Sequence, residues 1–399
     1  MKLIDEFIKN CTDAVFQKDF APLYEQARSE YEKSGVFFLT SEYIVKVNEL
    51  SGAYPRILAN LLLEAERVKK NPELMIYALF IHKAMCRRKL YMENIKSFTL
   101  PKEYELFAFL CLIPMIKNTY DTLTAMGIDK DIVDYTVNQY EECVFIYERR
   151  YDKLGMNKRY FDWLQHYVDC EILNINRLRF EIHSLSEPIY MLRRKSDGMD
   201  LLVLGEGEFN SDGLYSDTPP QKEAEFAAFF TETENEYIAH PVTEAGRVAP
   251  EPCVYSKSEY KKVIAKGDAL LSVHIPVEGE LSVSACRESY KRAKEVFAKF
   301  FPEVDIKGFV CYSWMMSPEL SLYMKPESRV LAFASPYIKF PIHTEGEDVL
   351  NFVFYLRFKT YEDLPEDTSL QRKLKRLYLD GGYLYEYGGI FAIDKIETI

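Results

Sequence analysis

Three consecutive stretches near the middle of the chain determine its architecture: ALLSVHIP (269–276), LSVSACRESYKRAKEVFAKFFP (281–302) and GFVCYSW (308–314). The first and third are short apolar runs rich in β-branched and aromatic residues, which is typical of strands. The second has its apolar side chains on one helical face, and Ser284 supplies an N-cap for this predicted helix. Strand, helix and strand at this spacing form a βαβ unit, so the two strands are predicted to be parallel neighbours.

Other elements can be predicted on both sides of this unit. In RLRFEIH (177–183), polar and apolar residues alternate with period two, which indicates a half-buried strand. A helix is predicted over 317–324, because Ser317 and Pro318 form an N-cap followed by proline in the first turn. Further strands are predicted over residues 201–204, 237–239, 350–357 and 383–393.

Residues 1–126 show helical periodicity without strand-like alternation. They carry 17 basic and 16 acidic side chains, whereas the remainder carries 33 and 46, so the acidic excess begins near Gly127. Two more helices are predicted just beyond that point, over 129–151 and 157–170. We therefore predict an all-helical N-terminal domain (1–126) and a mixed β-sheet domain with flanking helices (127–399), an α+β or α/β architecture.

Charge and apolar patterning exclude several classes of protein. The net charge of −12 disfavours sequence-independent nucleic-acid binding, which needs a cationic surface. The first ten residues, MKLIDEFIKN, lack the apolar region of a signal peptide. The longest apolar run, FAFLCLIPMI (107–116), has about half the length that a bilayer-spanning helix needs. We expect a cytoplasmic protein with neither a nucleic-acid nor a membrane partner.

The cysteines and histidines do not form a metal-binding pattern. No two of the eight cysteines are closer than 25 residues, so the CxxC spacing of zinc ribbons and thioredoxin-type motifs is absent. We expect reduced, mostly buried thiols, since a chain of this length has no need of disulfides. The spacings of His82, His166, His240 and His343 do not match those of metal ligands, and no metal site is predicted.

The stretches RLRFEI (177–182), LLSVHIP (270–276) and GFVCYSWMMSPEL (308–320), with the helical segment between the last two, resemble a bacterial family of acyltransferases. Members of this family pair a helical N-terminal domain with a GNAT-like C-terminal domain. The resemblance implies transfer of an acyl group, in the first place acetyl, from acyl-CoA to an amine of a small-molecule or peptide acceptor. In GNAT-type enzymes the donor lies where two adjacent parallel strands splay apart, and its pyrophosphate meets the following loop, here residues 277–284.

That loop departs from the GNAT pattern Q/R-x-x-G-x-G/A. Its sequence, VEGELSVSA, has a single glycine, Gly279, and two acids, Glu278 and Glu280. Carboxylates beside a pyrophosphate are unfavourable unless they point away. The amides at the start of the following helix would still bind an anion, and Arg287 adds a cation. The residues expected to bind acyl-CoA are Ser282, Ser284, Ala285, Arg287 and Cys311.

His274 is the first candidate for a general base. It lies at the carboxyl end of its predicted strand, just before Pro276, which ends strand pairing because proline has no amide hydrogen. A neutral imidazole can take the proton of an attacking amine. Parallel pairing is expected to set His274 near Cys311 or Ser313 on one face of the sheet. The alternative is a hydrogen-bonded histidine with a structural role.

Glu181 is the second candidate base, since it lies on the polar face of its predicted strand. Arg177 and Arg179 on the same face would lower the pKa of Glu181, and they could hold a substrate carboxylate. Arg179 and Ser313 are therefore the expected substrate-binding residues. The alternative is a solvated polar face.

The resemblance also implies a general acid. GNAT enzymes often use a tyrosine in the helix after the second splayed strand to protonate the departing thiolate, and Tyr323 occupies the matching position. The chain has 29 tyrosines, so a tyrosine at one given position is also expected by chance.

Two other functions remain open from the sequence. The degenerate loop favours a non-catalytic binding or regulatory protein that keeps a GNAT-like fold. In the other alternative Cys311 is a nucleophile with His274 as its base, as in thiol hydrolases, although no helix N-terminus at Cys311 would depress the pKa of the thiol.

Overall fold

The computed structural model describes residues 3–88, 94–277, 279–355 and 358–398 and divides the chain into two compact units. These units are Met1–Asn174 and Ile175–Ile399, so the boundary falls within strand β1 (Ile172–Ile175) instead of near Gly127. The reason lies in packing, because Tyr140, Phe161 and Leu164 are fully buried in the helical core. The change in charge and the change in packing thus occur at different points of the chain.

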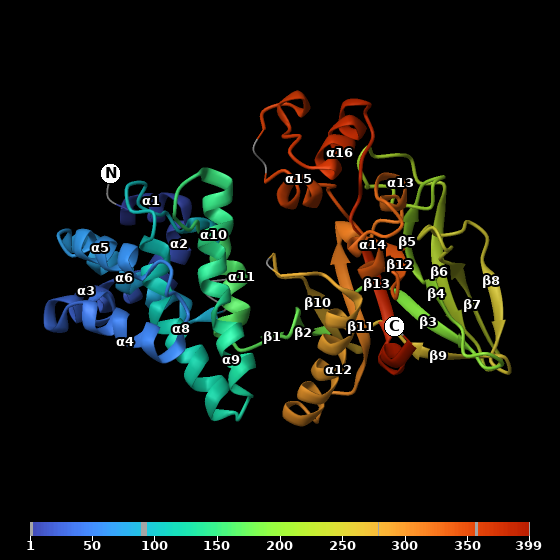
Figure 1. Cartoon of the computed structure of the whole chain (residues 1–399), viewed down its shortest axis with the longest axis horizontal. Helices are drawn as coiled ribbons and strands as arrows, with labels where there is room; N and C mark the ends of the chain where they lie inside the picture. The colour runs from blue at the N-terminus through green and yellow to red at the C-terminus, as the bar shows by residue number, and fades with distance from the viewer. Residues whose placement is uncertain (1–2, 89–93, 278, 356–357, 399) are drawn as a thin grey trace. The chain divides into compact units, whose positions relative to one another are not determined.

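Before β1, the regular elements of the first unit's described part are all helices, as predicted for residues 1–126 (Figure 1). Buried aromatic rings fill its core. The ring of Phe7 packs edge-on against those of Phe20 and Phe80, with centroid distances of 4.8 and 5.1 Å. The segment predicted as one helix over 129–151 forms two helices, which meet at Asn138. The α-helices are α1 (Leu3–Asn10), α2 (Asp13–Val15), α3 (Ala21–Ser34), α4 (Ser41–Ser51), α5 (Leu58–Val68), α6 (Pro72–Met85), α8 (Phe107–Ala125), α9 (Lys130–Val137), α10 (Gln139–Tyr151) and α11 (Arg159–Val168). Shorter turns are η1 (Phe16–Phe20), η2 (Phe37–Leu39) and η3 (Ile95–Ser97).

The second unit is built on a mixed sheet with the strand order β1-β2-β10-β11-β13-β12. Strands β10 and β11 are parallel, which confirms the prediction from the βαβ pattern. The pairs β2–β10, β11–β13 and β12–β13 are antiparallel. Besides β1, the strands are β2 (Leu178–Ser184), β10 (Ala269–His274), β11 (Ile306–Ser313), β12 (Ile338–Pro341) and β13 (Tyr387–Ala392).

A second, antiparallel sheet packs against one face of the first sheet. Its strand order is β5-β6-β7-β4-β3-β9, and β8 pairs with β7. The two sheets share a core in which Leu270, Val310 and Ile390 of the first sheet meet Met191 and Leu204 of the second. Two of its strands, β4 (Asp200–Leu204) and β7 (Glu236–Pro241), were predicted from the sequence. The others are β3 (Ile189–Arg194), β5 (Glu206–Phe209), β6 (Phe226–Glu232), β8 (Cys253–Ser256) and β9 (Tyr260–Ile264).

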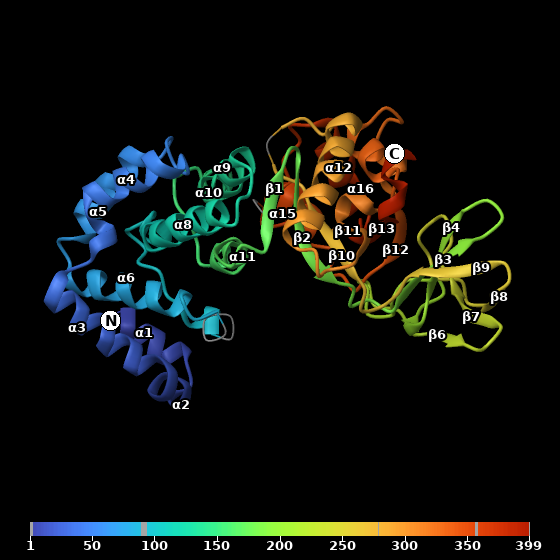
Figure 2. The same cartoon turned by 90° about the horizontal axis from the view of Figure 1, so that it is seen from below.

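Helix α12 (Val283–Phe300) packs on the opposite face of the first sheet (Figures 1 and 2). Its central side chain is Tyr290, whose ring lies 5.0 Å from that of Phe309 and 5.2 Å from that of Phe391. The hydroxyl groups of Tyr290 and Tyr337 share a hydrogen bond of 2.8 Å. Through these contacts the sheet fixes the position of the start of α12.

The remaining helices follow β11 in the chain. The predicted helix over 317–324 begins later than expected, because a 3₁₀ turn, η4 (Trp314–Met316), continues the chain after β11. Ser317 Oγ instead donates a hydrogen bond to Glu319 at 2.7 Å. The helices are α13 (Leu320–Tyr323), α14 (Arg329–Ala334), α15 (Asp348–Phe352) and α16 (Ser369–Leu379), with the 3₁₀ turns η5 (Tyr361–Asp363) and η6 (Ile393–Thr398).

The strand predicted over 350–357 is wrong for residues 350–352, which belong to α15; residues 356–357 lie outside the described part of the chain. A short apolar run cannot distinguish a strand from a buried helical turn, and here Val349 and Phe354 pack with Leu374 of α16. The strand predicted over 383–393 is shortened to β13. Within the described residues, no helix combines the length and the apolar character needed to cross a bilayer.

Candidate functional site

Strands β10 and β11 separate before either of them ends. Their paired residues run only as far as Ser272 and Val310, although β10 continues to His274 and β11 to Ser313. Beyond that point, β10 pairs with β2 on its other side, and β11 pairs with β13. The backbone edges that face each other between the two strands are therefore not joined by pairing at their carboxyl ends, where ligands bind in sheets of this kind.

A β-bulge near the start of this pair reverses one prediction. Ala269 lies opposite Ile306, but Leu270 lies opposite Gly308, so β11 contributes one extra residue. A shift of one residue moves every later side chain to the other face. His274 consequently shares its face with Val310 and Tyr312, and the expectation that it lies beside Cys311 or Ser313 is wrong.

His274 and Glu181 lie together on this face, as the antiparallel pairing of β10 with β2 requires. Glu181 lies opposite Ser272, and Arg179 lies opposite His274. His274 Nε2 is 3.4 Å from Glu181 Oε2 and 3.5 Å from Ser272 Oγ. The side chains of His274 and Glu181 are 31% and 20% exposed, so both are within reach of a ligand, whereas Arg179 is buried. The two candidate bases thus form one acid–imidazole pair, and the buried Arg179 lies opposite His274 in the strand pairing.

Cys311 and Ser313 lie on the face that α12 covers. Cys311 is 1% exposed, and burial raises the pKa of its thiol to about 12. Ser313 Oγ accepts a hydrogen bond from Met315 N at 3.1 Å and so caps the turn after β11. A buried, protonated thiol on the opposite face from His274 cannot be activated by it, which removes the thiol-hydrolase alternative.

We expect Cys311→Ala to leave acyl transfer unchanged within about threefold, because only packing is altered. Turnover of acyl-CoA with an identified acceptor is the measurement, and Cys253→Ala at an exposed cysteine is the control. A loss of a hundredfold or more in Cys311→Ala alone would restore the thiol as a nucleophile.

The loop between β10 and α12 presents the start of that helix. Ser282, instead of the predicted Ser284, is the N-cap, and its Oγ accepts a hydrogen bond from Ala285 N at 3.3 Å. Ser284 is exposed, and Ala285 and Arg287 are partly exposed. Within the described part of the chain, the Nε atom of Arg287 is buried without a hydrogen-bond partner. These residues, together with the helix N-terminus, can hold an anion.

Two arginines that the sequence analysis did not assign to the loop stabilise it. Arg177 donates from Nε to the carbonyl of Glu280 at 3.1 Å and from a terminal nitrogen to the carbonyl of Pro276 at 3.0 Å. Arg329, at the start of α14, forms an ion pair of 2.9 Å with the carboxylate of Glu280. One of the two unfavourable charges of the loop is therefore compensated, while Glu278 lies outside the described residues. No sequence signal could have revealed Arg329, since it comes from 49 residues further along the chain.

Tyr323 lies at the end of α13. Its ring packs against the cluster that contains Trp314 and Leu374, and its backbone carbonyl accepts a hydrogen bond from Lys373 Nζ at 2.7 Å. Its role as a general acid stays a prediction.

The polar face extends to side chains that the sequence analysis left out. Tyr312 donates from its hydroxyl to Glu187 Oε2 at 2.6 Å, and its hydroxyl is 3.4 Å from His183 Nε2. Burial, reinforced by Glu187, raises the pKa of Tyr312, which is therefore a neutral donor. The alternation of β11 is visible in the sequence, but the bulge that turns Tyr312 toward His274 is not.

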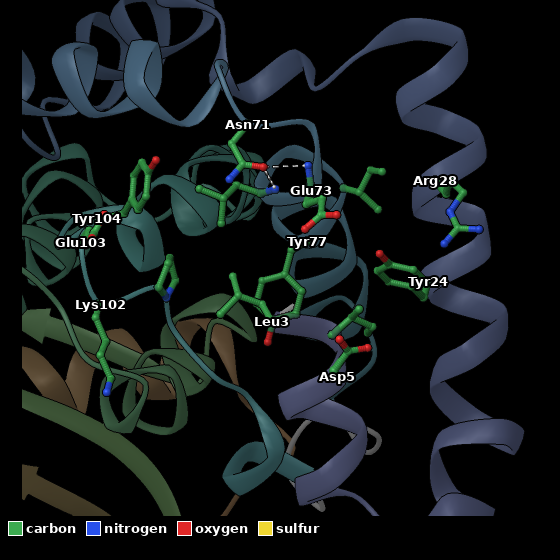
Figure 3. Close-up of a pocket in the computed structure, with 14 residues that line it drawn as sticks. Leu3, Asp5, Tyr24, Arg28, Asn71, Glu73, Tyr77, Lys102, Glu103 and Tyr104 are labelled. Atoms are coloured by element: carbon green, nitrogen blue, oxygen red, sulfur yellow. Dashed lines mark hydrogen bonds between the residues drawn. The ribbon is translucent and has the colours of Figure 1, made fainter. Parts of the chain in front are cut away.

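The helical unit contains a separate hollow of about 600 Å³ (Figure 3). It is lined by residues of α1, α3 and α6 and by residues 101–104, and it includes none of the predicted site residues. Several of its polar groups have partners: Asn71 Oδ1 accepts hydrogen bonds from Glu73 N and Leu74 N, and Arg28 lies over the ring of Tyr24 at 5.3 Å. The chemistry expected from the sequence thus belongs to the sheet unit.

Comparison with known proteins agrees with the fold. A family described as GNAT-like C-terminal domain matches residues 172–391, more than half of the chain. An acyltransferase in complex with decanoyl-CoA and teicoplanin superposes with a TM-score of 0.57 at 18% identity and covers 88% of each chain. A mutant acyltransferase in complex with octanoyl-CoA gives a TM-score of 0.55 at 17% identity, covering 88% of this chain and 99% of that one. No curated protein sequence matches the chain.

Proposed function

This chain belongs to the family with a GNAT-like C-terminal domain, and from that premise we propose that it transfers an acyl group from acyl-CoA to an amine. The acceptor is a small molecule or a peptide. The observation that carries the proposal is the separation of β10 from β11 beyond Ser272 and Val310, beside a polar face that presents His274 and Glu181. The use of acyl-CoA, an intracellular donor, agrees with the cytoplasmic location expected from the sequence.

We assign the donor to the gap between the two strands. Its pantetheine arm would pair with backbone groups at the unpaired ends of β10 and β11, near Cys311. Its pyrophosphate would meet Ser282, Ser284, Ala285 and Arg287 at the start of α12, where backbone amides and a cation favour an anion. Chains longer than acetyl deserve testing first, since structures that share this fold contain octanoyl-CoA and decanoyl-CoA.

The reaction needs a base, because an amine is mostly protonated at neutral pH and attacks only after losing a proton. In our proposal the imidazole of His274 accepts that proton, and the carboxylate of Glu181, whose Oε2 lies 3.4 Å from His274 Nε2, stabilises the resulting imidazolium. A carbon–nitrogen bond forms as the carbon–sulfur bond of the thioester breaks, and a proton from a general acid, for which Tyr323 is the candidate, neutralises the CoA thiolate. Arg179, which lies opposite His274 in the pairing of β2 with β10, remains the proposed substrate-binding residue, whereas Ser313 lies on the α12 face and caps the turn after β11.

A charge reversal at the helix start tests the donor site. We expect Arg287→Glu to weaken CoA binding at least tenfold, because an anion replaces a cation beside the pyrophosphate. Lys294→Glu is the matched control, since this exposed residue lies two turns further along α12. Calorimetric titration with CoA measures both variants. Equal affinity in wild type and Arg287→Glu, with the fold intact, would remove the assignment.

A further inference from the structure

A polar pocket in the sheet unit adjoins the face that carries His274. It has a volume of about 240 Å³. Its wall is formed by Tyr312, residues 342–345, Glu347, Asp348 and Glu386. The pocket therefore combines a phenol ring, an imidazole, a hydroxyl, one aliphatic side chain and four carboxyl groups.

Glu386 is the innermost of these acids. It is 7% exposed, and its Oε1 accepts a hydrogen bond from the backbone amide of Asp348 at 2.6 Å. Its other carboxyl oxygen, Oε2, is buried and has no hydrogen-bond partner within the described residues. A buried carboxyl oxygen without a hydrogen bond destabilises the folded state unless a donor reaches it.

Acidic groups outnumber basic groups in the pocket lining, although backbone amides, including that of Asp348, donate hydrogen bonds to Glu386. Burial raises the pKa of Glu386, and burial together with Glu386 raises the pKa of Asp348 to about 6. Glu345 and Glu347 add to the negative charge, and Glu386 contributes to the raised pKa of the nearby Tyr378 hydroxyl. His343 is the single basic residue of the lining, and its Nδ1 already pairs with Asp217 at 2.8 Å.

The arrangement fits an organic cation better than a metal ion. No three of the pocket's acidic and histidine groups bring ligand atoms within 4.8 Å of one another, so these residues lack the close set that a metal needs. Tyr312 and Ile342 instead add apolar surface to the lining, which suits the methylene groups of an alkylammonium ion. An alkylammonium ion would supply both the missing charge and a donor for Glu386 Oε2.

Tyr312 links this pocket to the polar face. It lines the pocket, and it also lies opposite Gly388 of β13, two residues after Glu386. By strand alternation Glu386 projects to the same side of the sheet as Tyr312, Glu181 and His274. A ligand in the pocket therefore occupies the face on which acyl transfer is proposed.

We propose that this pocket binds a protonated amine of the acceptor, so that the acceptor is a diamine or polyamine whose second amino group is acylated beside His274. The proposal rests on the proposed function for the second step, but cation binding is independent of it. The anchored ammonium group stays charged, while the other amino group loses its proton to the base.

Direct binding tests the pocket without any turnover. The probe is spermidine, titrated calorimetrically into wild type, Glu386→Gln, Asp348→Asn and the matched control Glu251→Gln, at an exposed acid outside the pocket. We expect affinity to fall at least tenfold in Glu386→Gln and Asp348→Asn and to stay unchanged in Glu251→Gln. Unchanged affinity in both pocket variants, or no binding by wild type, overturns the proposal.

Stability provides a readout that also shows whether the variants fold. A carboxyl whose pKa is raised by folding destabilises the native state as pH rises through the interval between its unfolded and folded pKa values, which for Asp348 is about 4 to about 6. Glu386→Gln keeps an oxygen acceptor for the Asp348 amide but removes the charge. We expect its melting temperature to exceed that of wild type at pH 7.5 and not at pH 4. The absence of any gain at pH 7.5 contradicts an uncompensated charge in the pocket.

Acylation assays separate the failure of this inference from the failure of the proposed function. With 1,5-diaminopentane as acceptor, we expect Glu386→Gln to raise KM at least tenfold with kcat nearly unchanged, and with pentylamine to change neither. If both amines are acylated and Glu386→Gln affects neither, the pocket proposal fails and acyl transfer stands. If spermidine binding depends on Glu386 but no amine is acylated, the pocket stands and acyl transfer fails.

Discussion

His274→Ala should lower kcat by about 10² to 10⁴ while leaving CoA affinity nearly unchanged. The expectation follows from the position of the imidazole, at the end of β10 where the strand separates from β11, and from its contact with Glu181 Oε2 at 3.4 Å. Removing it deletes the group that accepts the amine proton but leaves the start of α12 intact. Steady-state turnover of acyl-CoA with an identified acceptor, together with calorimetry of CoA, measures both parts.

Two further variants distinguish proton transfer from positioning. His274→Gln retains hydrogen bonding but cannot act as a base, so a loss equal to that of His274→Ala indicates proton transfer. Glu181→Gln should lower kcat less than His274→Ala does. The double variant should have a kcat only slightly below that of His274→Ala, because the two side chains act as one unit. Recovery of activity in His274→Gln, or full activity in His274→Ala, would make the histidine structural.

Tyr290→Ala should destabilise the sheet unit by about 3–5 kcal/mol. Its ring is 1% exposed and contacts Phe180, Phe309 and Phe391, so truncation leaves a large cavity between α12 and the sheet. Because this contact fixes the start of α12, the variant should also weaken CoA binding. Urea unfolding in a Trp163→Phe background, where Trp314 alone reports on the sheet unit, gives the free energy of unfolding.

The hydroxyl of Tyr290 can be tested apart from its ring. Tyr290→Phe removes the 2.8 Å hydrogen bond between the hydroxyl groups of Tyr290 and Tyr337. It should lower the free energy of unfolding by about 1–3 kcal/mol. The double variant Tyr290→Phe/Tyr337→Phe should lose less unfolding free energy than the two single variants added together, because each single variant already removes the same hydrogen bond. A loss below about 1 kcal/mol in Tyr290→Ala would show that α12 is held by other contacts.

The βαβ unit could be predicted because its evidence is local. The apolar runs of β10 and β11 and the one-sided helix between them lie within about fifty residues, and their parallel pairing follows from chain connectivity. His274 and Glu181 could be nominated for the same reason, since each lies on the polar side of an alternating strand. Their contact needed the register of β10 with β2, which only the structure supplies.

The remainder of the site depends on features without a local signature. One extra residue in β11 near Gly308 turns Tyr312 toward His274 and Cys311 toward α12, and a bulge is not visible in alternation alone. Glu386 and Asp348 come from segments 38 residues apart, and their meeting depends on the packing of the C-terminal helices. The helical periodicity of residues 130–168 can be recognised in the sequence, but the sequence does not show that these helices pack against the core of the first unit. The predicted boundary near Gly127 therefore precedes the one that the structure shows.

A crystal structure of the protein with decanoyl-CoA would locate the donor independently of any acceptor. We predict that the pantetheine arm runs between the ends of β10 and β11 beyond Ser272 and Val310, with the pyrophosphate at residues 282–287 and the thioester on the side of His274. Decanoyl-CoA bound elsewhere, for example in the hollow of the helical unit, or no binding at a concentration of about 1 mM, near the upper end of ordinary KM values, would contradict this account.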